Sequence, residues 1–245
     1  MLEHSKFKLG RSSVKLSPRH RRMSASLLDL LPPPPPSSVD NTKGVINFGM
    51  MLNDSIGDCT IAGLGHSIQI ASLASGILDT PTDSTILEGY ENLCGYNPDD
   101  PSTDQGGVET DILSTIQSTG FSDRKLLGWV SPDPSNTDHL KKAIFYFKSL
   151  YTGVELPLSA QNSGLWDVVD GPNGVAGGWG GHCMCLPKYD ENFTFITWGK
   201  LQEVTPAWLS AYLDEAHVLL WDDMISLFPQ DTQDQIMQML KELDN

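Results

Sequence analysis

Cys59 occupies the position in this sequence where a thiol is best placed to become a nucleophile. The preceding residues 53–58 have the composition of a turn, and an apolar run with helical spacing follows them. Asp58 is therefore predicted to be the N-cap of a helix that begins at Cys59. A helix N-terminus carries roughly half a positive charge and unpaired N–H donors, which favour the thiolate and lower the thiol pKa. The chemistry indicated is nucleophilic attack by a cysteine.

Such a nucleophile needs an imidazole to take its proton and hydrogen-bond donors to stabilise an oxyanion. His182 is the best imidazole, because it follows the glycine-rich residues 174–181 and begins a predicted strand. Asn53, six residues before Cys59, offers a side-chain amide as one oxyanion donor, and the backbone N–H of Cys59 offers a second. We therefore predict one catalytic site made of Cys59, His182 and Asn53.

The run His182-Cys183-Met184-Cys185 contains residue types that bind metals, but its pattern does not favour a metal site. Side chains alternate between the two faces of a strand, so the histidine and the two cysteines point apart. The sequence has no further Cys or His pair that would complete four zinc ligands. We predict no metal, no cofactor and no disulfide framework.

The elements that would position these residues run from helices to strands along the chain. Apolar residues at helical spacing predict helices at residues 59–76, 108–119, 138–150, 205–214 and 231–243. Residues 95–107 read as a loop. Strands are predicted at residues 152–157, 182–186, 193–198 and 218–221, with the second and third forming a hairpin. This order favours an α+β fold, in which a helical half packs against a mostly antiparallel sheet.

Charge is distributed unevenly over the 245 residues, which carry a net charge of −15. Residues 1–22 hold seven of the 16 basic residues and one of the 31 acidic residues, so the remainder has a net charge of −21. Five prolines, residues 32–36, follow this basic arm as a stiff spacer. Two functions fit this arm: contacts with neighbouring protein subunits through residues 1–36, or binding of nucleic acid. The alternative without a function is a solvated tail.

The hydropathy pattern predicts a protein that is neither inserted into a membrane nor exported through a signal peptide. No run of 18 apolar residues is present to cross a membrane, and the basic N-terminus is not followed by a signal-peptide pattern. We expect cytoplasmic synthesis without a signal peptide and no membrane partner.

Taken together, the motifs resemble those of the papain-like cysteine peptidases, in order, through residues 35–200. Residues 53–59 resemble the family's nucleophile motif, and Cys59 and His182 lie 123 residues apart, near the ~130–150 usual for the class. Gln105-Gly106-Gly107 resembles the segment whose backbone pairs with substrate, and Thr197-Trp198-Gly199 resembles the segment whose tryptophan shields the triad. The resemblance implies a two-lobed papain-like fold and a peptide or protein substrate. Its implied catalytic residues are Cys59, His182 and Asn53, and its implied substrate-contacting residues are Gly106, Gly107 and Trp198.

The sequence also departs from the family pattern. The third triad residue, an asparagine two positions before the tryptophan, is replaced by Ile196, which cannot orient an imidazole. Asn53 is shorter than the usual oxyanion glutamine, and Thr60 replaces the aromatic residue after the nucleophile. These departures predict a Cys-His dyad with weak or narrow activity. The alternative is a catalytically reduced scaffold that serves as a structural or decoration protein of a large assembly, such as a phage virion.

Three parts of the chain are predicted. Residues 1–37 form the basic, proline-rich arm, which is too short for the family's inhibitory helix pair. Residues 38–222 form the papain-like domain, and residues 223–245 form a C-terminal helical extension.

Overall fold

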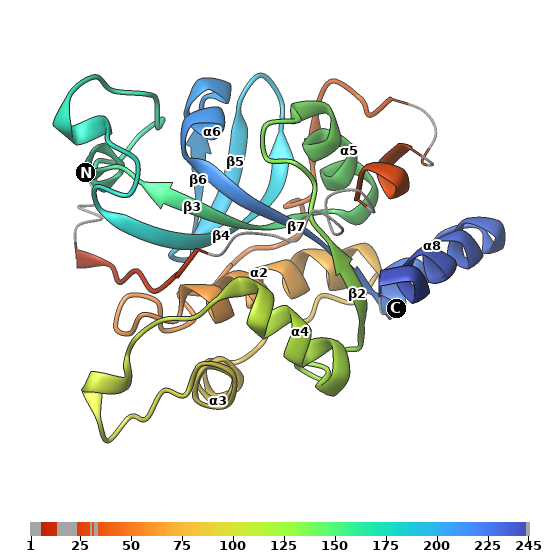
Figure 1. Cartoon of the computed structure of the whole chain (residues 1–245), viewed down its shortest axis with the longest axis horizontal. Coiled ribbons are helices and arrows are strands. Elements are labelled where there is room, and N and C mark those ends of the chain that lie inside the picture. Colours follow the sequence, from red (N-terminus) through yellow and green to blue (C-terminus); the bar gives the residue numbers. More distant parts are fainter. Residues whose placement is uncertain (1–5, 14–23, 30, 32–33, 244–245) are drawn as a thin grey trace.

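The computed structural model describes residues 6–13, 24–29, 31 and 34–243 (Figure 1). Within these residues, seven strands form a single antiparallel sheet with the order β2-β7-β3-β4-β5-β6, and the short β1 pairs with the last two residues of β4, beyond the part that pairs with β3. The strands are β1 (Val39–Asp40), β2 (Leu126–Val130), β3 (Leu150–Leu156), β4 (Gly180–Tyr189), β5 (Phe193–Thr197), β6 (Lys200–Val204) and β7 (Leu213–Trp221).

The helices gather mainly on two sides of this sheet. Three of them, α2 (Cys59–Ala74), α3 (Asp83–Cys94) and α4 (Glu109–Thr119), lie together below the sheet in Figure 1, and α5 (Thr137–Phe147) and α6 (Pro206–Tyr212) pack above. The chain closes with α7 (Asp222–Ile225) and α8 (Gln230–Leu243) at the periphery. This is the predicted α+β arrangement, with one mostly helical lobe and one sheet lobe.

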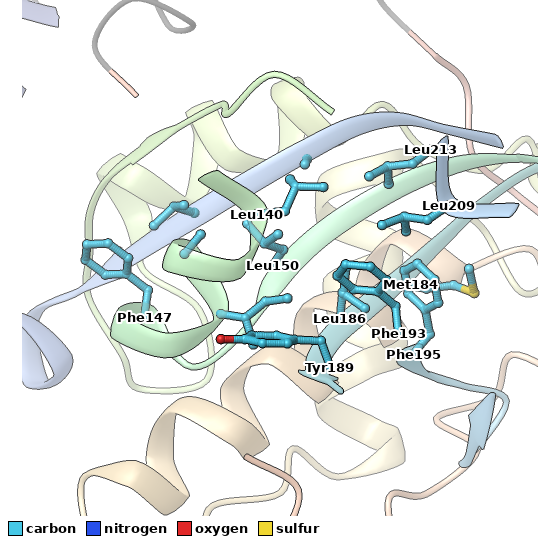
Figure 2. Packing of buried hydrophobic residues seen from close by; sticks show 14 of the residues in the cluster. Leu140, Phe147, Leu150, Met184, Leu186, Tyr189, Phe193, Phe195, Leu209 and Leu213 are labelled. Atoms are coloured by element: carbon cyan, nitrogen blue, oxygen red, sulfur yellow. The ribbon is translucent and has the colours of Figure 1, made fainter. Parts of the chain in front are cut away.

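Strand β4 separates the two hydrophobic cores, because its side chains alternate between them. Met184 and Leu186 join the larger core with residues of α5 and α6, and Figure 2 shows this packing. Cys183 points to the other face and joins the core around α2. Burying both faces makes β4 the central element of the molecule, and His182 lies near the end at which the strand begins.

Local signals explain several helix boundaries. The Thr82 hydroxyl accepts a hydrogen bond from the Thr85 N–H at the start of α3, and Gly95 ends that helix with φ 75°. The side chains of Asn136 and Thr205 cap α5 and α6 in the same way. Helix α5 stops at Phe147, three residues before its predicted end, because Leu150 begins β3. The sequence analysis predicted neither α3 nor the strands β2 and β6.

The N-terminal residues are part of the packed structure where they are described. Residues 24–29 are helical, and Leu27, Leu28 and Leu31 are buried in the larger core. Residues 6–13 lie between α2 and β4, and the Tyr189 hydroxyl donates a hydrogen bond to the Pro36 carbonyl. Arg19, Arg21, Arg22 and the first two prolines of the spacer lie outside the described residues. The division of the chain at residues 37 and 222 stays a prediction.

None of the helices in the described ranges combines the length and the apolar character needed to cross a lipid bilayer.

Candidate active site

Cys59 is the first residue of α2, as the sequence predicts, and its side chain is completely buried. The preceding Asp58 is the N-cap residue, as predicted, although its carboxylate makes no cap hydrogen bond. The thiol faces the backbone N–H groups of Cys183 and Gly10. Burial outweighs these donors and raises the pKa of Cys59 to about 12. In this arrangement the thiol is protonated, contrary to the lowered pKa that the helix N-terminus predicts.

The turn before Cys59 brings Asn53 to the same region through an unusual backbone. Met51 and Leu52 both have positive φ, 54° and 66°, a conformation that non-glycine residues rarely adopt. The Asn53 side chain is buried and donates one long hydrogen bond, 3.4 Å, to the Ile56 carbonyl. Its side chain also interacts with the buried Asp58 carboxylate through a hydrogen bond. Asn53 remains a candidate for the oxyanion donor, with its amide group engaged inside the turn.

Asp104 links this turn to the predicted substrate-contacting segment. Its carboxylate accepts hydrogen bonds from the Gly57 N–H at 2.9 Å and from the Tyr90 hydroxyl at 2.7 Å. The Tyr90 hydroxyl accepts in turn from the Gly106 N–H at 2.9 Å. The nucleophile turn and Gly106 are thus held in register by one buried network, which sequence reasoning missed.

His182 begins the buried part of β4 and is stacked on Trp198, with ring centroids 4.5 Å apart and planes inclined by 18°. Its Nε2 lies 2.7 Å from the Thr197 hydroxyl, and its Nδ1 has no hydrogen-bond partner within the described part of the chain. Burial, with the positive charges of Arg11 and His66, lowers the pKa of His182 to about 3. The imidazole is therefore neutral near pH 7.

Thr197, the residue after Ile196, is the hydrogen-bond partner of His182. Ile196 points away from the imidazole into a small core with Phe48, Ile70 and Cys185. The next residue on β5 projects to the opposite face, where its hydroxyl meets His182. Sequence reasoning compared only the position of Ile196 and missed Thr197, although strand alternation and the adjacent Trp198 were signals that could have found it.

The N-terminal residues 6–13 cover this site. The Arg11 N–H donates to the Gly181 carbonyl at 3.3 Å, the Gly107 N–H donates to the Gly10 carbonyl at 2.7 Å, and the Ser12 N–H donates to the Gly107 carbonyl at 3.0 Å. A Cβ atom at Gly10 would overlap the Gly57 carbonyl oxygen, so only glycine permits this approach.

The covering segment reaches the aromatic residues as well, because Phe7 packs on Trp198 with ring centroids 5.0 Å apart. Residues 6–13 therefore contact the predicted substrate-contacting residues Gly107 and Trp198, and Gly106 closely approaches the Gly10 carbonyl. The structure brings Cys59, the strand of His182, Gly107 and Trp198 together around one short stretch of the chain.

Beside this site, the Arg11 side chain enters a group of carboxylates, which we call the acidic cluster: Glu109, Glu155, Asp214 and Glu215. His217 lies behind it, with Nε2 3.3 Å from Glu109 and 3.4 Å from Glu215. Burial alone would lower the pKa of His217, but these two carboxylates outweigh it and raise the pKa. The possible ligand atoms of Glu109, Glu215 and His217 lie within 4.8 Å of one another, a spacing that could suit a cation. Here the guanidinium supplies the positive charge.

The fold has clear counterparts among solved structures. Xylellain, a cysteine protease from Xylella fastidiosa, superposes with a TM-score of 0.61 at 15% identity, covering 87% of this chain and 96% of that one. Procathepsin L 3 of the Tenebrio molitor larval midgut gives a TM-score of 0.56 at 12% identity, covering 89% and 77%. ProCathepsin B S9 from Trypanosoma congolense gives 0.53 at 9% identity, covering 90% and 88%. The chain has the papain-like cysteine protease fold. No family model and no curated protein matches the sequence.

The papain-like fold confirms the predicted architecture, and at these identities the likeness concerns the fold alone. The roles of Cys59, His182 and Asn53 stay predictions that the local geometry supports to different degrees. Support is strongest for His182, because its free Nδ1 and bonded Nε2 match what a general base requires.

Proposed function

We propose that this protein is a papain-like cysteine peptidase that cleaves peptide or amide bonds with Cys59 as nucleophile and His182 as base. The observation that carries the proposal is the 2.7 Å contact between His182 Nε2 and the Thr197 hydroxyl. If Nε2–H donates to Thr197, the lone pair of the imidazole sits on Nδ1, where it can take the proton of a thiol. Thr197 is then a positioning residue.

The reaction begins when the Cys59 sulfur forms a bond to the substrate carbonyl carbon while its proton passes to His182 Nδ1. The side chain of Asn53 and the Cys59 N–H stabilise the oxyanion. The C–N bond then breaks, the amine leaves with the proton from His182, and a thioester remains. Water hydrolyses the thioester through the same base, which releases the carboxylic acid and restores the thiol.

Residues 6–13 must leave before a substrate can enter, since they occupy the backbone positions around Gly107 and Gly181. The covered form is latent for a second reason. A thiol with a pKa of about 12 and an imidazole with a pKa of about 3 cannot form a thiolate–imidazolium pair near neutral pH. Solvent access would remove the burial that causes both shifts.

One argument for the alternative function as a structural component was the loss of an orienting group at Ile196; the basic arm and the lack of an inhibitory helix pair were others. Thr197 supplies a polar partner for the imidazole, so this argument for lost activity is weakened. Contacts with neighbouring subunits or nucleic acid through residues 1–36 stay predictions. In this structure, residues 6–13 contact their own chain.

Alkylation by iodoacetamide near neutral pH tests the proposal. We expect slow modification of Cys59 in the wild-type chain. In the Arg11→Ala variant, which loses the ion pairs that hold the segment, Cys59 should react faster than the half-buried Cys94 and faster than a free thiol such as N-acetylcysteine amide. Peptide mapping locates the label. If an exposed Cys59 reacts no faster than the free thiol, Cys59 is not an activated nucleophile, and the proposed function is wrong.

A further inference from the structure

The occupant of the acidic cluster is the side chain of Arg11, which is wholly buried, so its charge requires partners of opposite charge. Its Nε lies 3.1 Å from Glu109, its Nη1 lies 3.1 Å from Glu155, and its Nη2 lies 2.8 Å from Asp214 and also contacts Glu215. All three guanidinium nitrogens therefore face carboxylates. An ammonium group has a single nitrogen and could not meet these positions together, so the arrangement fits arginine better than lysine.

The acidic cluster has a closed floor and an open rim. The side chains of Glu109 and Glu215 are 0% and 2% exposed, whereas those of Glu155 and Asp214 are 33% and 34% exposed. These residues come from three elements, α4, β3 and β7. Gly153 on β3 leaves the room between them, because a Cβ there would overlap the Arg11 guanidinium.

Charge makes an empty cluster unfavourable. Four carboxylates converge within reach of one guanidinium, and His217 behind them balances only part of that charge. Burial raises the pKa of both Glu109 and Asp214, against the lowering effect of Arg11, so these carboxylates are poorly solvated. A cation that enters when Arg11 leaves would relieve this repulsion.

The backbone of Arg11 lies where a substrate backbone would lie under the proposed function. It runs between the Gly107 loop and Gly181, one residue from Gly10, which faces the Cys59 thiol. A side chain that projects from this position reaches the acidic cluster. The pocket is therefore connected to the reacting groups through one residue of extended chain.

We propose that the acidic cluster is a specificity subsite for an arginine side chain of the peptide substrate, and that Arg11 is its internal occupant. This inference rests on the proposed function. Peptides with arginine at the subsite position are the preferred substrates, and neutral residues of the same shape are poor ones.

The test uses the full-length Arg11→Ala variant. Its substrates are peptides that differ only at one position, which carries arginine, lysine or citrulline and is moved along the peptide from one set to the next. EDTA in every buffer excludes metal ions. Citrulline keeps the shape of arginine without its charge. We expect kcat/KM for the arginine peptide to exceed that for citrulline by about 100-fold and that for lysine by about 10-fold. Adding Glu215→Gln should reduce the arginine-to-citrulline ratio at least about 10-fold. Adding Asp111→Asn, an exposed acid on the same helix as Glu109, should leave the ratio unchanged.

A binding experiment separates the two proposals. In the Arg11→Ala, Cys59→Ala double variant, calorimetry should show N-acetylarginine amide binding at least about 10-fold more tightly than N-acetylcitrulline amide. Hydrolysis without preference for arginine overturns the subsite and leaves the peptidase. Selective arginine binding without any hydrolysis overturns the peptidase and leaves the subsite. If Arg11→Ala does not fold, Arg11→Lys replaces it, because lysine keeps a positive charge but has only one nitrogen to face the carboxylates. The same arginine-to-citrulline ratios of kcat/KM and of affinity then test the proposal.

Discussion

Two buried histidines lie on β4 and β7, and each contacts a hydroxyl group and an indole ring, but His217 also faces two carboxylates. His182 on β4 contacts a hydroxyl group and an indole ring, and its pKa is lowered to about 3. His217 on β7 contacts Glu109 and Glu215, and its pKa is raised. Both side chains are fully buried, so burial alone does not determine the charge of an imidazole.

The difference separates two tasks that a peptidase must perform. A base must change its charge during the reaction, which is easiest among neutral partners that do not fix either protonation state. A group that recognises a cation must keep a constant negative field, and the two carboxylates that supply it raise the pKa of His217. Our proposals therefore assign proton transfer to His182 and charge recognition to the acidic cluster in front of His217.

The largest effect should come from removing the base. In the Arg11→Ala background, His182→Ala should lower kcat for peptide hydrolysis about 10³-fold, because it removes the proposed acceptor of the thiol proton. His217→Gln should act mainly by raising KM for arginine peptides. Steady-state kinetics with one arginine peptide and its citrulline counterpart separates these effects. Equal losses of kcat in both variants would contradict the division of tasks.

Thr197→Val keeps the shape of the side chain and removes its hydroxyl group. We expect kcat to fall about 10- to 100-fold with little change in KM, because the imidazole loses the partner that fixes its tautomer. Thr197→Ser should retain most activity, and Thr194→Val, a buried position on the same strand, serves as the control. The pH dependence of kcat/KM should shift in Thr197→Val alone. An unchanged profile would show that His182 does not depend on this contact.

Ile196→Asn restores the family's residue at its usual sequence position. Because this side chain faces the core with Phe48 and Ile70, the amide would be buried without a partner, and we expect a loss of about 1–3 kcal/mol in the free energy of unfolding. Denaturant unfolding measures the loss, with Ile196→Val as the control for volume. A gain in hydrolysis would mean that the asparagine reaches the imidazole, contrary to the direction in which Ile196 points.

The pH dependence of stability should have opposite signs for the two histidines. The pKa of His182 is lower in the folded chain than the usual 6.5, so its contribution is present above pH 6.5 and is lost as the pH falls toward 3, by up to about 1.4 kcal/mol per pH unit. The pKa of His217 is raised, so its contribution is present below pH 6.5 and is lost as the pH rises through its folded value.

Unfolding of the wild type, His182→Gln and His217→Gln at pH 5 and 7.5 measures both trends. The stability difference between wild type and variant should shrink toward acid for His182 and grow toward acid for His217. If both stability differences change in the same direction with pH, the two histidines do not have pKa values shifted in opposite directions.

The sequence predicts the fold well where one residue pattern determines one element. The helix that begins at Cys59 and the hairpin of β4 and β5 follow from apolar periodicity and turn residues. Strand β6 pairs with the adjacent β5, but it was missed because its mostly exposed, polar residues gave no strand pattern. Strand β2 was missed because its stability comes from pairing with β7, which is distant in the sequence. Local patterns do not contain such contacts.

The candidate site shows the same limit. Cys59 and His182 can be recognised by residue type and spacing, but the partner of the imidazole could be found only from the side toward which β5 presents Thr197. The pKa of Cys59 was predicted in the wrong direction, because the helix terminus is local whereas the burial comes from core residues distant in the sequence, such as Cys183. Arg11 was counted as one charge of a basic arm, and only the fold gives it four carboxylate neighbours.

The covalent connection between Arg11 and its own binding groups has a consequence for how the protein responds to concentration. A tethered occupant is present at an effective concentration on the order of millimolar, whatever the amount of protein. Dilution therefore would not uncover Cys59. A single cut between residues 13 and 24, a stretch that contains Lys15, Arg19, Arg21 and Arg22, would convert the occupant into a separate peptide with an ordinary dissociation constant. After such a cut, the fraction of open sites would rise as the protein is diluted.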